Sequence, residues 1–230
     1  MKKGTDKRRT PLTAGVIAGS IKPQDVKKAI ASGADILEIR VDTYRRRNPD
    51  DIARAMRGAG RPTILTIRSK KEGGRFHIPD DKRLELFNAL APFAKYVDIE
   101  LSSSAILKNV VDLSRRLGKK LIISYHNFKK TPGGKELTGI VKKGISLRAD
   151  IVKIACAAKD AGDFRRLASL LIAYDCLSVI GMGRGGKASR VLFPALGSKI
   201  AYGSITTAAA PGQMSVREIK KEFKRFYITG

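Results

Sequence analysis

Residues 121–155 read LIISYHNFKKTPGGKELTGIVKKGISLRADIVKIA, and two short apolar runs in this stretch flank a longer amphipathic segment. The runs at 121–125 and 151–155 are short and rich in isoleucine, which is typical of buried strands. Residues 135–143 between them have helical spacing, and the Pro132-Gly133-Gly134 turn precedes them. The stretch therefore predicts a strand, a helix and a second strand in succession.

The same alternation continues in both directions along the chain, with short connections marked by Gly, Pro, Asp or Ser. Eight strands are predicted, at residues 14–19, 36–41, 63–68, 96–100, 121–125, 151–155, 177–181 and 200–203. Eight helices are predicted between and after them, at residues 23–32, 50–59, 80–91, 104–117, 135–143, 161–174, 188–196 and 215–226.

Strict alternation of strands and helices favours an α/β fold with parallel strands, and eight repeats in 230 residues fit a closed (β/α)8 TIM barrel. We expect residues 1–230 to form one such domain, with residues 1–12 as a basic N-terminal extension. The alternative, an open doubly wound sheet, would usually have a dinucleotide-binding loop after its first strand, and residues 20–23 offer none. In the barrel, the chemistry is expected at the carboxyl ends of the strands.

The composition excludes several classes of protein. Hydrophobic residues make up 43% of the chain, which is too many for a disordered protein. The sequence has no apolar run long enough to span a membrane, and no apolar core of a signal peptide follows the basic residues 1–10. We therefore expect a cytoplasmic protein without a membrane partner. With two cysteines, Cys156 and Cys176, and two histidines, neither a disulfide framework nor a bound metal is expected. We expect both cysteines to pack as small apolar residues.

The chain is strongly basic, with 46 Lys and Arg residues against 21 Asp and Glu residues and a formal charge of +25. Such a charge attracts nucleic acids and other polyanions. However, the densest basic runs, residues 2–9 and 45–47, have little aromatic interleaving that could stack bases. We therefore expect no dedicated nucleic-acid partner, and interpret the charge as a Lys/Arg-rich surface suited to high temperature or to an anionic small substrate.

Lys153 is the most informative polar residue, because Val152 and Ile154 flank it in a strand expected to be buried on both faces. Burial would lower the pKa of its amine and produce a nucleophile able to form a Schiff base with a ketone or aldehyde. A lysine that is ion-paired near the strand end is the structural alternative. His126 ends the preceding strand and could act beside it as an acid/base, although it could equally be a core imidazole bonded to backbone.

Further polar residues end the other predicted strands, namely Glu38, Arg40, Arg68, Glu72 and Glu100. The glycine-rich segment 181–189, GMGRGGKAS, begins like a phosphate-binding P-loop but has Ala188 at the magnesium position. It could still hold a phosphate or a carboxylate, helped by Arg184, Lys187 and Arg190.

Taken together, ILEIRVD, TIRSKKEGG, SYHNFKKTP, DIVKIA, GMGRGGKASR and AAPGQMSV resemble type I 3-dehydroquinate dehydratase, the Schiff-base dehydratase of the shikimate pathway. The likeness runs from about Ile17 to about Phe226. It implies a (β/α)8 barrel that converts 3-dehydroquinate to 3-dehydroshikimate, a step of aromatic amino acid biosynthesis, without a metal or an organic cofactor.

The resemblance also implies roles for individual residues. Lys153 corresponds to the imine-forming lysine, His126 to the acid/base, and Glu72 to the glutamate that orients the histidine. Five more positions match those that bind the substrate: Glu38, Arg40 and Arg68 around its hydroxyls, and Arg190 and Gln213 around its carboxylate and ring.

The chain departs from the family pattern at Ala209, where the family often has serine, and at Arg184, where it has methionine. Ser20 on the first strand has no clear counterpart. Two alternative functions stay open, another Schiff-base barrel lyase such as a class I aldolase, and a catalytically degenerate barrel that binds polyanions. The sequence favours a homodimer only slightly over a monomer. The aromatic residues near the carboxyl end could form a dimer interface or pack in the core, namely Phe223, Phe226 and Tyr227.

Overall fold

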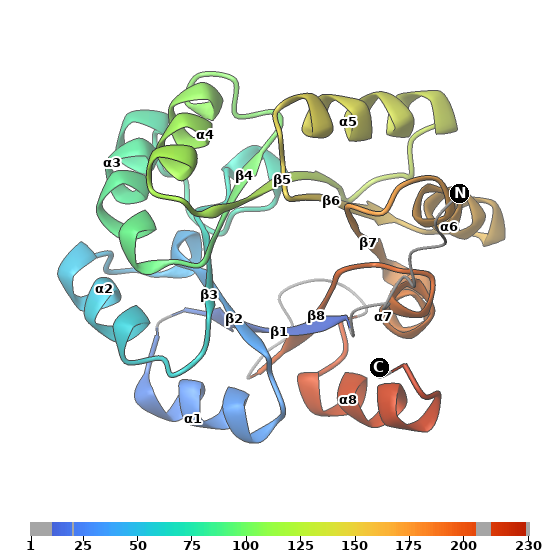
Figure 1. The fold of residues 1–230 in the computed structure, drawn as a ribbon, viewed down its shortest axis with the longest axis horizontal. Coiled ribbons are helices and arrows are strands. Elements are labelled where there is room, and N and C mark those ends of the chain that lie inside the picture. Colours follow the sequence, from blue (N-terminus) through green and yellow to red (C-terminus); the bar gives the residue numbers. More distant parts are fainter. Residues whose placement is uncertain (1–10, 20, 206–212, 229–230) are drawn as a thin grey trace, which may run out of the picture.

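The computed structural model describes residues 11–19, 21–205 and 213–228, which form a (β/α)8 barrel (Figure 1). Eight parallel strands follow one another around it in the sheet order β7-β6-β5-β4-β3-β2-β1-β8. Their bounds are β1 Leu12–Ala18, β2 Ile36–Arg40, β3 Thr63–Thr66, β4 Tyr96–Glu100, β5 Lys120–Asn127, β6 Ile151–Ala157, β7 Leu177–Met182 and β8 Ile200–Ser204.

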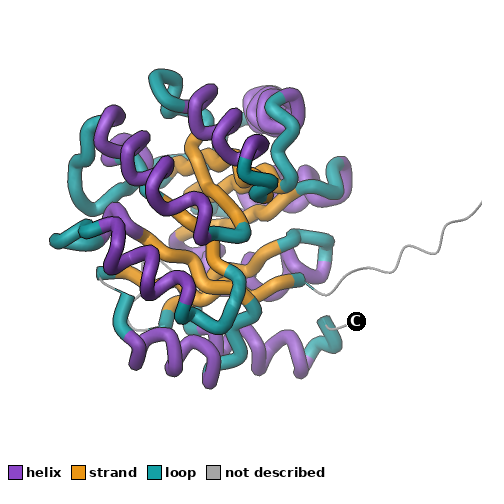
Figure 2. Tube along the Cα trace, turned by 60° about the vertical axis from the view of Figure 1, so that its left-hand side comes forward, coloured by secondary structure: helices purple, strands orange, loops and turns teal. Residues whose placement is uncertain are grey.

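Helices surround the strands on the outside in both views (Figures 1 and 2). Their bounds are α1 Pro23–Ala31, α2 Pro49–Arg57, α3 Asp80–Leu90, α4 Leu107–Arg116, α5 Gly134–Ser146, α6 Ala161–Ala173, α7 Gly186–Ala195 and α8 Val216–Arg225. Four short 3-10 helices, which the sequence patterns do not predict, are η1 Val41–Thr43, η2 Lys70–Glu72, η3 Ala91–Phe93 and η4 Gly183–Gly185.

Side chains help to close the barrel between β7 and β8. The backbone N–H of Lys199 donates to the carbonyl of Leu177 at 2.8 Å. Next to this bond, the Ser198 hydroxyl accepts the N–H of Val179 and the Ser178 hydroxyl accepts the N–H of Ile200. These bonds satisfy backbone groups where the strand ladder is incomplete.

The predicted fold class and the order of all sixteen major elements are confirmed, with differences only at their ends. The largest differences, of three residues each, are at the start of α4 and the end of α5. α4 begins at Leu107 rather than at residue 104, because Ser103 is part of a turn and its hydroxyl bonds to Glu100, and α5 continues to Ser146 rather than ending at residue 143. Leu12 already belongs to β1, so the predicted extension overlaps the first strand at this residue. Residues 1–10 of that extension lie outside the described residues.

Side chains alternate along each strand between the barrel interior and the helices. On β6, Ile151 and Ala155 belong to the interior cluster, while Val152, Ile154 and Cys156 pack in the outer core against α5 and α6. Lys153 has the same parity as Ile151 and Ala155, so it points inward. Cys156 is buried, and burial raises the pKa of its thiol to about 12, which fits a packing role.

Candidate active site

A layer of inward-facing side chains surrounds Lys153 in the upper part of the barrel. The alternate strands β2, β4, β6 and β8 contribute one residue each, namely Glu38, Asp98, Lys153 and Tyr202. A layer of four side chains from alternate strands is how a (β/α)8 barrel fills its interior. Here three of the four are ionisable groups that carry charge, so this layer is built for chemistry rather than for apolar packing.

Lys153 is buried, with 4% of its surface exposed, and it is held by three groups. Its Nζ lies 3.1 Å from Glu38 Oε1, 3.1 Å from Asp98 Oδ2, and 4.0 Å from the centre of the Tyr202 ring. The two carboxylates and the ring face all favour a cation at this point. The amine is thus paired, as in the structural alternative, and is not isolated in an apolar core.

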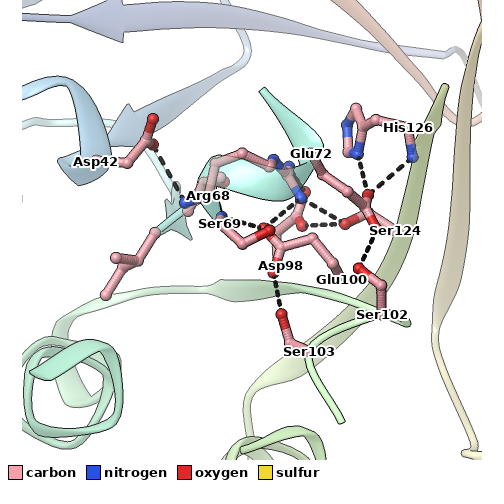
Figure 3. A network of polar contacts seen from close by, with 12 residues as sticks. Asp42, Arg68, Ser69, Glu72, Asp98, Glu100, Ser102, Ser103, Ser124 and His126 are labelled. Atoms are coloured by element: carbon pink, nitrogen blue, oxygen red, sulfur yellow. Dashed lines mark hydrogen bonds and ion pairs between the residues drawn. The ribbon is translucent and has the colours of Figure 1, made fainter. Parts of the chain in front are cut away.

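Arg68 connects this layer to the neighbouring strands (Figure 3). Its Nη2 donates to Asp98 Oδ2 at 3.1 Å, and its Nη1 donates to Glu100 Oε1 at 3.1 Å and to Ser124 Oγ at 2.7 Å. Burial alone would raise the pKa of Asp98, but Arg68 and Lys153 hold it well below its usual range. Asp98 is therefore a fixed negative charge beside the lysine.

His126 and Glu72 form a second pair (Figure 3) and line the same cleft as Lys153. Glu72 Oε2 lies 3.0 Å from His126 Nδ1 and accepts the backbone N–H of the same histidine at 2.8 Å. Ser102 donates its hydroxyl to the other oxygen of Glu72. Burial, reinforced by the cations Arg68 and Lys153, lowers the pKa of His126 well below its ordinary value. A neutral imidazole that donates from Nδ1 to Glu72 presents Nε2 as a base.

Arg190 is buried at the start of α7, beneath the glycine-rich turn. Its Nη1 donates to the carbonyls of Gly181 at 3.0 Å and Gly186 at 2.8 Å, and its Nε donates to the carbonyl of Tyr202 at 3.3 Å. Within the part of the chain that the structure describes, these partners are all neutral, and burial lowers the pKa of Arg190 to about 10. A buried guanidinium with neutral partners favours an anionic ligand.

All eight residues singled out from the sequence line one cleft at the carboxyl ends of the strands, with an empty volume of about 530 Å³ that includes its open mouth. They are Glu38, Arg40, Arg68, Glu72, His126, Lys153, Arg190 and Gln213. The remaining lining residues are Val16, Gly73, Phe128, Ala155, Ile180, Met182 and Tyr202.

Two residues of the cleft are constrained by close neighbours. Arg40 makes a bidentate pair with Asp42, with both distances at 2.9 Å. Gly73 adopts a left-handed conformation with φ of +88°, and a Cβ there would lie 2.6 Å from the ring of Phe128. Only glycine fits this close approach without displacing the aromatic ring.

Of the positions at which the chain departs from the family pattern, the structure describes Arg184. Arg184 is exposed in η4 and is not among the residues that line the cleft. The expectation that Arg184 helps the glycine-rich segment to hold an anion is therefore not supported by the lining of this cleft. Ala209 and Ser20 fall outside the described residues.

Asp98 and Tyr202 are the two members of the lysine layer that the sequence reasoning missed. Asp98 carried a usable signal, since it stands in YVDIE between Val97 and Ile99, just as Lys153 stands in IVKIA. Burying the charge of an aspartate inside an apolar strand is costly, as it is for a lysine, so Asp98 could have been predicted as a functional residue on the same grounds. Tyr202 carried no such signal, because aromatic residues are common in strands.

These features define a class, the (β/α)8 barrels whose polar site lies at the carboxyl ends of the strands. Residues 21–229 match the family model described as type I 3-dehydroquinase. The 3-dehydroquinate dehydratase of Hydrogenobaculum sp. (strain Y04AAS1) is 39% identical over 202 residues, which cover 86% of this chain and 91% of that protein. The chain belongs to the type I 3-dehydroquinase family.

The comparison of structures agrees with this assignment. The crystal structure of the 3-dehydroquinate dehydratase from Aquifex aeolicus VF5 superposes with a TM-score of 0.85 and is 37% identical. The superposition covers 94% of this chain and 99% of that one. The resemblance drawn from the motifs is thereby confirmed.

Proposed function

We propose that this chain performs its family's reaction through an imine on Lys153. The chain is a 3-dehydroquinate dehydratase, a lyase of the shikimate pathway that converts 3-dehydroquinate to 3-dehydroshikimate and water. The roles of individual residues are the proposal. The observation that carries them is that Lys153, His126 and a buried arginine without a described anionic partner all line one cleft.

In the first step, the neutral amine of Lys153 attacks the C3 ketone of the substrate, and loss of water from the adduct gives an imine. Protonation makes the imine a cation at the position that the lysine ammonium occupies. Glu38, Asp98 and the face of Tyr202 already surround that position. They therefore stabilise the iminium without rearrangement, which is the advantage of a preorganised site.

In the second step, the iminium withdraws electrons from the neighbouring carbon and acidifies its C2 hydrogen. His126 removes this proton through Nε2 and then returns it to the C1 hydroxyl, which leaves as water. The bond from Nδ1 to Glu72 fixes the tautomer and the ring orientation that this transfer needs. Hydrolysis of the imine consumes one water, releases 3-dehydroshikimate and regenerates Lys153, so the overall reaction loses one water.

Arg190 and Gln213 bind the substrate carboxylate and ring, and Glu38, Arg40 and Arg68 bind its hydroxyls. A planar guanidinium forms two parallel hydrogen bonds with a carboxylate, which an ammonium group does not. The described partners of Arg190 are carbonyl oxygens, which carry only partial negative charge. The substrate carboxylate therefore gives Arg190 a partner with a full negative charge. This accounts for a buried arginine that makes no ion pair with the described residues.

Turnover of 3-dehydroquinate tests the proposal, followed through the conjugated enone that 3-dehydroshikimate contains. Wild type should convert the substrate without added metal or cofactor. Lys153→Met keeps the side-chain length but removes the amine, and should lose activity by several orders of magnitude. If Lys153→Met turned over like wild type, the imine proposal would be wrong.

The two alternatives from the sequence have less support. A class I aldolase would cleave a carbon–carbon bond in a sugar phosphate, and incubation with such substrates distinguishes it. The superposition on a 3-hexulose-6-phosphate synthase is only 13% identical and reflects the shared fold. A degenerate polyanion-binding barrel would show salt-sensitive binding and no turnover.

We also propose a single domain, a cytoplasmic location and a homodimer as working assignments. None of the described helices is long and apolar enough to cross a membrane. Phe223 packs in the core, whereas Phe226 and Tyr227 after it are 57% and 89% exposed. Sedimentation velocity of the wild type and of Phe226→Ser tests whether this exposed pair contributes to a dimer.

A further inference from the structure

Arg83 is the most deeply buried cation outside the cleft. It lies on the outer helix α3, yet only 1% of it is exposed. Its Nη2 donates to Glu100 Oε2 at 2.5 Å, and its Nε donates to the carbonyl of Ile67 at 3.0 Å. Its Nη1 donates to Asp80 and Ser103, at 2.8 and 3.0 Å. A guanidinium with this many partners is rigidly fixed.

Glu100 joins this outer arginine to the cleft. Its Oε2 accepts from Arg83. Its Oε1 accepts from Arg68 Nη1 at 3.1 Å and from the backbone N–H of Ser69 at 2.9 Å (Figure 3). Ser69 immediately precedes η2, the short helix that carries Glu72. One buried carboxylate therefore holds both the substrate-facing Arg68 and the start of the turn that positions Glu72.

The contacts continue to Lys153 as a chain of alternating charge. Successive ion pairs measure 2.5, 3.1, 3.1, 3.1 and 3.1 Å, and join Arg83, Glu100, Arg68, Asp98, Lys153 and Glu38 in that order. Every member is at most 4% exposed. Three cations balance three anions, and at this depth solvent does little to screen an imbalance.

We propose that Arg83 is a positioning residue for the dehydration, acting through Glu100 on Arg68 and Asp98 and so on the amine of Lys153. This inference rests on the proposed function of Lys153. Without Arg83, Glu100 becomes an uncompensated buried anion that competes with Asp98 for Arg68. Asp98 Oδ2, which Arg68 and Lys153 share at 3.1 Å each, then loses part of its arginine contact and moves relative to Lys153, so the amine is no longer held where it attacks the ketone.

The experiment compares Arg83→Met, Arg83→Lys and the double variant Arg83→Met with Glu100→Gln. Lys82→Met is the matched control, because Lys82 is the adjacent residue of α3 and its side chain is 58% exposed. Each protein is checked for folding by thermal melting and assayed well below its midpoint. The readouts are kcat, KM and the rate of borohydride trapping with 3-dehydroquinate, all normalised to the number of sites that can be trapped.

Arg83→Met should lower kcat and the trapping rate by about tenfold, the usual scale for losing a residue that supports a reactive group, with less change in KM. Arg83→Lys should show a smaller fall in kcat and trapping rate, because it keeps the positive charge but not the planar set of guanidinium donors. The double variant should recover about threefold relative to Arg83→Met, since it removes the uncompensated anion. Lys82→Met should match wild type.

A purely structural Arg83 would change the melting temperature and the number of active sites, but not the rate per active site. Wild-type rates per site in all the folded Arg83 variants would overturn the inference, and so would a double variant that is slower than Arg83→Met. If Arg83→Met does not fold, Arg83→Lys and the double variant provide the same test. Wild-type protein that forms no adduct would instead refute the proposed function.

Discussion

Asp98 Oδ2 lies 3.1 Å from Lys153 Nζ and joins two strands, β4 and β6, that are not neighbours in the sheet. The same oxygen lies 3.1 Å from Arg68 Nη2. Asp98 therefore separates two buried cations that would otherwise repel each other. This arrangement fixes the lysine before any substrate arrives, and its first consequence is for stability.

Asp98→Asn is expected to lower the free energy of unfolding by about 3 kcal/mol or more, because two buried cations lose their shared anion. Glu85→Gln, which removes an exposed partner of Lys82, should change it by less than about 1 kcal/mol. Urea denaturation of both variants measures the difference. Equal stability of the two would show that Asp98 does not compensate the cations.

The activity of the enzyme should depend on the ionisation of His126. Burial and the nearby cations lower its pKa well below the usual value of about 6.5. As the pH rises through that lowered pKa, the imidazole becomes the neutral base and activity increases. In kcat, which reports the groups of the substrate complex after Lys153 has formed the imine, the rise should thus be complete below about pH 6.5, and a rise centred near pH 7 would contradict the neutral-base assignment.

His126→Ala should still form some trapped imine while turnover falls by at least about a hundredfold, because proton transfer alone is lost. Trapping and turnover measured on the same sample separate the two steps. Parallel loss of both would mean that His126 is needed before proton abstraction.

Glu72→Gln should reduce kcat by less than His126→Ala does, since the amide oxygen can still accept from the Nδ1 hydrogen. Its effect on KM should be small, because Glu72 acts by orienting the histidine. Steady-state kinetics of both variants show which of them loses more kcat. A larger loss for Glu72→Gln would indicate a direct role for the carboxylate in proton transfer.

Arg190→Lys should raise KM by about tenfold with a smaller change in kcat, because the bidentate contact with the substrate carboxylate contributes to ground-state binding. Arg184→Ala provides the control, since Arg184 is exposed and outside the cleft lining. It should leave KM unchanged. A KM for Arg190→Lys that matches this control would remove Arg190 from carboxylate binding.

The sequence patterns predict the barrel well because each buried strand is a short apolar run with turn residues on both sides. Lys153 and His126 could be placed in one cleft because the carboxyl ends of parallel strands meet there. Helix ends were harder, as residues 102–106 show. Ser103 helps to bind Glu100 and Arg83 there instead of starting a helix.

The partners of Lys153 could not be predicted, because Glu38 and Asp98 lie 115 and 55 residues away in the chain. Their distance depends on the stagger of the strands around the barrel, which local patterns do not encode. Arg83 was hidden for a related reason. In DDKRLELF it stands among charged residues of an amphipathic helix, and only the tertiary structure reveals that it is buried.

Borohydride reduction of the wild-type protein with 3-dehydroquinate, followed by intact mass and peptide mapping, tests the central claim most directly. We expect one ligand-sized adduct per chain, located on Lys153 and absent from Lys153→Met. An adduct on another lysine, or turnover without any adduct, would contradict it.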